Sequence, residues 1–253
     1  TDLAQEQKIP VLLRLAFRPL FLGAASFSAL AIAWWGAILA GWVTFKPALP
    51  IVFWHSHEMV FGFGSAVVAG FLLTAMQNWT GLRAPHGKPL ALLVACWLLA
   101  RLANAATVAM PLPLLILIDL SFLPLAAGLL AKPLIAARQY RNLFFIPLLL
   151  VLTICNALMW FGLTPGYEQL QNHGSTSAVL LITLVMAIVG GRVLPMFTAN
   201  GTRTTRVTSL VWLDRAALGS CWAVFAFHFF HLQTWLPTQV PFLLCTVAAT
   251  LLA

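Results

Sequence analysis

Two histidines and a glutamate stand at the head of a long apolar run, where their side chains could bind a metal or move protons. His55, His57 and Glu58 lie directly before the apolar run 60–76. Ionisable groups at membrane depth are costly and usually functional. On a regular helix His55 and His57 point about 200° apart, whereas His55 and Glu58 share a face. One metal could bind both histidines only if His55 lies in a non-helical segment. Otherwise they serve different sites, or one is a ligand and the other a proton or orientation partner.

The elements that position these residues are membrane-spanning helices. Hydrophobic residues make up 61% of the 253-residue chain and charged residues 8%, and a helix of about 20 apolar residues crosses a bilayer. The sequence predicts an all-α, polytopic transmembrane helical bundle of about seven complete spans, forming one domain over 1–253. An eighth run opens near Pro241 and stops at Ala253, so we expect the domain to be incomplete at its C-terminal end. The predicted spans are 19–41, 52–78, 89–110, 112–131, 143–163, 175–197 and 211–231.

Basic residues predict the orientation of the bundle. They concentrate before the first span and in alternate connections, while the remaining connections carry only Lys46. By the positive-inside rule the N-terminus is cytoplasmic, in a protein that crosses the membrane several times. The net charge of +8 therefore describes topology, and it indicates a lipid bilayer rather than a nucleic acid as partner. The sequence identifies no protein partner.

The other histidines sharpen the prediction of a metal site. In this topology His173 opens the sixth span and His228 and His231 close the seventh on the outer side, the side on which His55 and His57 begin the second. Five of the six histidines then lie near one membrane boundary. Imidazole suits copper and iron, and the spacing does not choose between them.

Two further features of the sequence each have a structural interpretation and a functional one. Gly62, Ala66 and Gly70 recur every four residues, which favours close helix packing or contact with a flat cofactor. Arg101 lies about nine residues before the turn between the third and fourth spans, and Asp119 about eight residues after it. An antiparallel hairpin of these spans brings the two to the same depth, which predicts an intramembrane ion pair, either for neutralisation or as part of a proton relay.

Several ordered motifs resemble the NnrS family of bacterial inner-membrane proteins. They are the segments 15–23 with Arg18, 54–63, 70–75, 78–81 with Asn78, and 190–198 with Arg192, where Pro195 is predicted to kink or end a helix. The resemblance implies about twelve helices in the full protein, bound haem and copper, and a role in nitric oxide metabolism or resistance during denitrification.

The resemblance and the residues together give a leading hypothesis and two alternatives. In the leading hypothesis the protein holds haem or copper near the periplasmic side, with nitric oxide as a possible ligand. His57 and then His55 are the first ligand candidates, followed by His173, His228 and His231, and Glu58 would orient an imidazole. The alternatives are a transporter or channel for a small ion or nitrogen oxide, and an assembly or anchor partner of a respiratory complex. No phosphate loop or nucleophile motif occurs, and whether the protein is an enzyme stays open.

Overall fold

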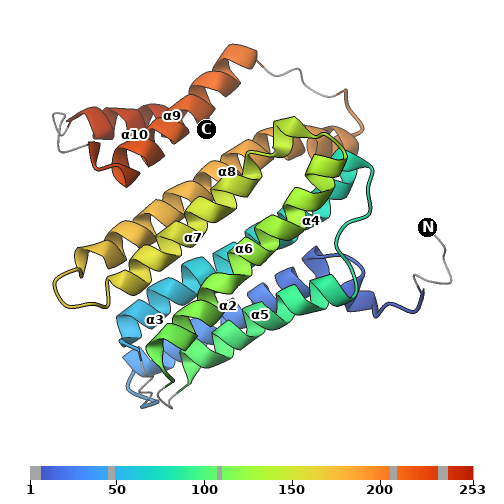
Figure 1. The fold of residues 1–253 in the computed structure, drawn as a ribbon. Coiled ribbons are helices and arrows are strands. Elements are labelled where there is room, and N and C mark those ends of the chain that lie inside the picture. The colour runs from blue at the N-terminus through green and yellow to red at the C-terminus, as the bar shows by residue number, and fades with distance from the viewer. Residues whose placement is uncertain (1–6, 45–48, 107–109, 206–209, 233–238, 253) are drawn as a thin grey trace. The chain divides into compact units, whose positions relative to one another are not determined.

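A computed structural model describes residues 7–44, 49–106, 110–205, 210–232 and 239–252, and within these ranges the chain forms helices and no strand (Figure 1). The predicted all-α class is confirmed. The elements are η1 Val11–Leu13, α2 Phe17–Leu39, α3 Ile51–His57, the π-helix η2 Glu58–Gly64, α4 Ser65–Thr80, α5 Lys88–Ala105, α6 Leu112–Ala136, η3 Tyr140–Asn142, α7 Phe145–Phe161, α8 Gln169–Thr202, α9 Val211–Phe229 and α10 Gln239–Leu252.

Six helical segments of the described chain are long and apolar enough to cross a membrane, which supports a multi-pass protein. These are Phe17–Leu39, Ile51–Thr80, Lys88–Ala105, Leu112–Ala136, Tyr140–Phe161 and Gln169–Thr202. The expected seventh span is present as helix α9 but is not among the six. Asp214, Arg215 and His228 lower its hydropathy. Helix α8 runs through Pro195 to Thr202, so this proline does not end the helix.

The chain divides into two compact units, Thr1–Ser175 and Thr176–Ala253. The first contains α2 to α7 and the beginning of α8. The second contains the remainder of α8 together with α9 and α10, which pack on each other. The single domain over 1–253 stays a prediction.

Helix α6 is central to the first unit, because it contacts α4, α5 and α7. Its buried residues recur every three or four positions, which gives the helix a protein-facing side. They are Leu115, Asp119, Phe122, Leu123, Ala126, Ala127, Leu130 and Leu134. Asp119 thus belongs to the same buried side as the apolar residues that fix α6 against its neighbours.

Helix α2 packs against the small residues of the second span. A Cβ atom built on Gly70 would lie 3.1 Å from Leu20 Cβ, and one on Gly62 would lie 2.7 Å from Phe27 Cε1, while Ala66 is fully buried. Trp97 Nε1 donates to the Gly62 carbonyl at 2.8 Å. Side chains of α2 thus lie beside both glycines, and a Cβ atom on Gly62 would also lie 2.9 Å from Glu58 Oε2 and 3.0 Å from Arg101 Nη1. These contacts agree with close helix packing, and the cofactor surface stays a prediction.

Gly62→Ala is expected to lower the free energy of unfolding by about 1–3 kcal/mol, because the added methyl group would be overpacked against Phe27, Glu58 and Arg101. Gly128→Ala is the matched control. Gly128 is also helical, but nothing lies within 4 Å of its built Cβ, so alanine should be neutral or stabilise by up to about 1 kcal/mol. Denaturant titration of the purified protein, followed by circular dichroism, measures both. Equal stability of the two variants would contradict the packing assignment.

Candidate functional site

A group of polar side chains, which we call the charge cluster, is buried among five helical elements of the first unit. Each member is at most 4% exposed. The members are His57 from α3, Glu58 from η2, Arg101 and Asn104 from α5, Asp119 from α6, and Asn156 and Trp160 from α7. Buried charge at this depth is stable only if it is paired and hydrogen-bonded.

Asp119 is the main acceptor of the charge cluster. Its Oδ2 accepts from Asn156 Nδ2 at 2.8 Å and from Trp160 Nε1 at 3.0 Å. The same oxygen lies 3.0 Å from His57 Nε2. Oδ1 pairs with Arg101 Nη2. Groups from α3, α5 and α7 therefore converge on one carboxylate of α6.

Arg101 bridges two carboxylates. The structure brings it together with Asp119, as the hairpin argument predicts, and adds Glu58, whose Oε2 lies 2.6 Å from Arg101 Nη1. Asn104 Nδ2 donates to Glu58 Oε1 at 2.9 Å. The planar guanidinium suits such a bridge, since it presents several donors in fixed directions.

Sequence reasoning missed Asn104, Asn156 and Trp160 as members of the charge cluster. The two asparagines carried a usable signal, because each is a polar residue isolated among apolar ones within a predicted span. Trp160 carried none, since ten tryptophans are spread along the chain and most suit a lipid interface.

His57 has an acceptor at each ring nitrogen. Nδ1 lies 3.1 Å from Glu58 Oε1, and Nε2 lies 3.0 Å from Asp119 Oδ2 and 2.8 Å from Asn156 Oδ1. An imidazole satisfies acceptors on both sides only as the doubly protonated imidazolium. In that form two cations balance two carboxylates, and the charge cluster is neutral as a whole.

Glu58 contacts His57, although the sequence predicts that it shares a helical face with His55. It is the first residue of the π-helix η2. The backbone at His57 and Glu58 keeps α-helical angles, so the π-helical turn lies beyond this contact. Such segments are frequent at functional sites. The imidazole that Glu58 contacts is thus that of His57, and its role in orienting a metal ligand stays a prediction.

His55 lies in a different environment from His57. Its ring is half-buried and stacks on Trp35 of α2, with the ring centroids 4.3 Å apart and the planes 8° from parallel. Its buried Nδ1 has no hydrogen-bond partner among the residues described. The two histidines therefore have separate surroundings, which was one of the alternatives left open by their spacing.

The family model described as "NnrS protein" matches residues 11–253. The chain belongs to the NnrS family. No curated protein and no solved structure matches the sequence.

The surroundings of the two histidines differ in how well they fit the haem or copper that NnrS membership implies. His57 does not fit as a ligand in this arrangement, because both nitrogens are engaged by protein acceptors and a metal would have to displace one of them. His55 fits better as a ligand, since its Nδ1 has no hydrogen-bond partner in the described chain. Within the described ranges, no three His, Cys, Asp or Glu side chains are grouped to hold a metal ion.

The remaining histidines of this NnrS protein are divided between the compact units. His173 is half-buried in the first turns of α8, next to Gly174, whose built Cβ would lie 2.5 Å from the Cys155 carbonyl of α7. His228 and His231 belong to the second unit, and His231 has a positive φ of 53°. The common level of five histidines stays a prediction.

The other NnrS motif residues line two cavities. Arg18 and Asn78 line a polar cavity of about 640 Å³ in the first unit. Arg192 lines a cavity of about 570 Å³ in the second unit, together with Asp214. None of these three residues belongs to the charge cluster.

Proposed function

We propose that this NnrS-family protein acts in the bacterial response to nitric oxide, and that it holds haem or copper near the periplasmic side of the inner membrane. Family membership over residues 11–253 supports the association with these cofactors. The structural observation that carries the proposal is His55, a half-buried imidazole whose Nδ1 lacks a partner in the described chain.

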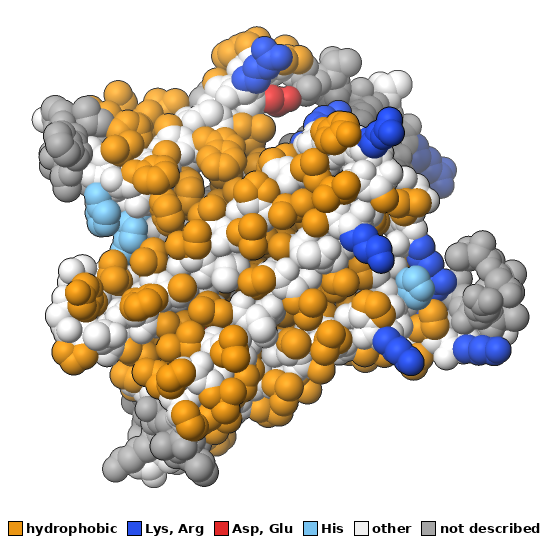
Figure 2. Space-filling model, viewed as in Figure 1, with side chains coloured by type: hydrophobic (Ala, Val, Ile, Leu, Met, Phe, Trp, Pro, Cys, Tyr) orange, Lys and Arg blue, Asp and Glu red, His pale blue; other side chains and the backbone are white. Residues whose placement is uncertain are grey.

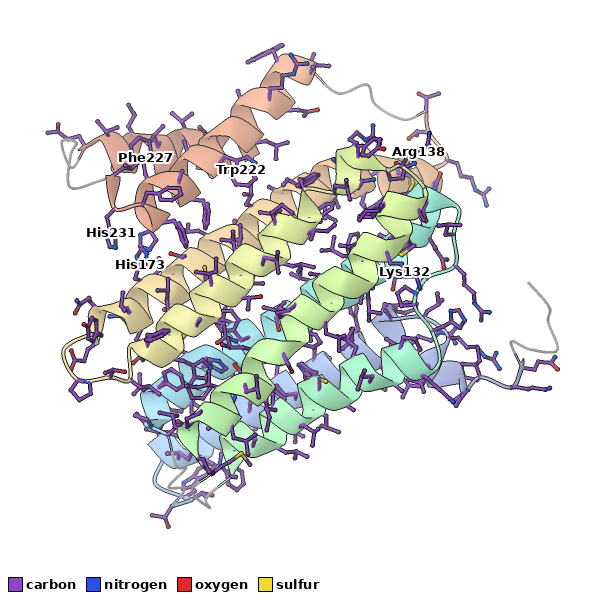
Figure 3. The ribbon with its side chains drawn as sticks, in the orientation of Figure 1. Lys132, Arg138, His173, Trp222, Phe227 and His231 are labelled. Carbon is purple, nitrogen blue, oxygen red and sulfur yellow. The ribbon has the colours of Figure 1, made fainter. Side chains whose placement is uncertain are left out.

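The proposed orientation has support from the first unit. Its Lys and Arg side chains visible in Figure 2 gather toward the end where α2 begins and α4 and α6 end, and the labelled Lys132 and Arg138 lie there (Figure 3). Helix α3, with His55, is at the other end (Figure 1). A cytoplasmic basic end would put His55 near the periplasmic boundary.

His55 would supply the imidazole ligand, and Trp35 would fix the plane of its ring by stacking. Haem iron or copper, when bound, supplies a coordination position for nitric oxide. His57 and Glu58 act as positioning residues in this proposal. Their hydrogen bonds tie α3 and η2 to α5, α6 and α7, and so hold the turn that carries His55.

His55→Ala is expected to lower the bound haem or copper by at least about tenfold, because it removes the ligand itself and even a partner outside the coordination sphere is worth 10–100-fold. The full-length protein is purified, and its optical spectrum and metal content are recorded per mole of folded protein. His86→Ala is the control, since His86 lies in the connection between α4 and α5, away from α3.

Two results would contradict different parts of this proposal. Wild-type protein without a Soret band and without copper would remove the cofactor proposal altogether. An unchanged amount of bound haem or copper in His55→Ala would contradict only the assignment of His55 as a ligand. The other histidines would then be the ligand candidates.

A further inference from the structure

A second polar site lies at the basic end of the first unit. It is the cavity of about 640 Å³ that contains Arg18 and Asn78, and it is also lined by Arg14, Gln77 and Arg83. We call it the arginine pocket. Three guanidinium groups and two amides thus converge on one space, and no carboxylate is among the described residues that line it.

The walls of the arginine pocket are held together by hydrogen bonds between separate segments. Phe17 N donates to Thr74 Oγ1 at 3.0 Å, which joins the start of α2 to α4. Gly87 N donates to Leu13 O at 2.9 Å, which joins the α4–α5 connection to η1. The α4–α5 connection turns at Gly81 and Gly87, whose φ angles are 69° and 62°. Glycine adopts positive φ angles readily because it has no Cβ atom. The pocket is therefore a fixed part of the fold.

Two of the arginines are anchored and still retain donors. Arg18 Nη1 donates to Val11 O at 2.9 Å, and Arg14 Nε donates to Ile9 O at 3.0 Å. A guanidinium has five N–H donors, so most of those on Arg18 have no protein acceptor within the described chain. These anchors fix the side chains while leaving N–H groups for a ligand.

The positive charge of the arginine pocket favours the binding of an anion. Arg14 and Arg18 are half-buried and line one cavity, and their described hydrogen bonds go to backbone carbonyls. Their two like charges repel each other, and an anion between them removes that cost. The positive-inside rule explains basic residues at this end in general. The rule does not explain why several arginines line one cavity. Arg141, for example, is exposed at the basic end and lies outside the pocket.

We propose that the arginine pocket binds a phosphate group. Arginine pairs with phosphate oxygens through two parallel N–H bonds, and a tetrahedral phosphate offers oxygens to several guanidinium groups at once. Asn78 and Gln77 supply further donors. The phosphate comes either from the headgroup of an anionic phospholipid, whose chains would meet exposed apolar side chains such as Leu82 beside the pocket, or from free phosphate in the cytoplasm.

The test uses the full chain in phosphatidylcholine nanodiscs and two probes. Phosphatidylglycerol is titrated and its binding is read by native mass spectrometry, and radiolabelled inorganic phosphate is measured by equilibrium binding. Arg18→Gln should weaken binding of the true ligand by about tenfold or more, since it removes a charge-assisted hydrogen bond. The affinity of Arg18→Lys for the ligand should lie between those of the wild type and Arg18→Gln, because lysine keeps the charge but lacks the planar guanidinium group. Arg141→Gln, with the same loss of charge outside the pocket, should match the wild type.

Binding of phosphatidylglycerol that depends on Arg18 assigns the lipid headgroup, and binding of inorganic phosphate that depends on Arg18 assigns free phosphate. Binding of neither probe, or equal losses in Arg18→Gln and Arg141→Gln, overturns the proposal. If Arg18→Gln does not fold, Asn78→Ala provides the same comparison, because this exposed side chain makes no hydrogen bond within the described chain.

Discussion

Asp119→Ala is expected to lower the free energy of unfolding by about 3–5 kcal/mol, the range for removing one partner of a buried ion pair. The substitution leaves Arg101 Nη2 and Trp160 Nε1 without their acceptor and takes one from His57 Nε2. It also leaves two cations against one carboxylate. Denaturant titration in detergent, followed by circular dichroism, measures the loss, and a large part of the expressed variant should fail to reach the folded state.

Ser121→Ala is the matched control on the same helix. Ser121 is half-buried, and its hydroxyl bonds only the Ile118 carbonyl one turn earlier, so the change should stay within about 0.5 kcal/mol. A loss for Asp119→Ala no larger than that for Ser121→Ala would show that the charge cluster does not stabilise the fold.

Arg101→Met should be comparably destabilising, by about 3–5 kcal/mol, because it leaves Glu58 and Asp119 with only His57 as a counter-charge. Arg101 is 4% exposed, so water does not replace the lost donors. The same titration measures this variant. Leu98→Ala on α5 is the control, since Leu98 is 48% exposed and lies outside the charge cluster.

The double substitution Arg101→Met with Glu58→Gln separates charge balance from simple loss of contacts. It removes one cation and one anion together, so the charge cluster stays neutral with His57 and Asp119. The double variant should be more stable than the sum of the two single losses predicts, by about 1–3 kcal/mol. Additive losses would mean that Arg101 and Glu58 act independently, contrary to their 2.6 Å contact.

The hydropathy of the chain was enough to predict an all-α membrane bundle and the position of each long helix. Boundaries agree closely for some spans, as for 52–78 against Ile51–Thr80, and less closely for others, as for 175–197 against Gln169–Thr202. The hairpin argument also brought Arg101 and Asp119 to one depth, since equal distances from a turn depend only on the rise per residue. The NnrS motifs likewise indicated the family that residues 11–253 match.

Tertiary structure decided which polar groups meet. The sequence could not show that Asn156 and Trp160 of α7 face Asp119, because partners on different helices depend on helix rotation and packing. Nor could it show that the second span contains a π-helix, or that Glu58 contacts His57 rather than His55. Periodicity describes one helix at a time, whereas a buried hydrogen-bond network is a property of several helices packed together, and that is why the predicted ligand His57 was found inside a closed charge cluster.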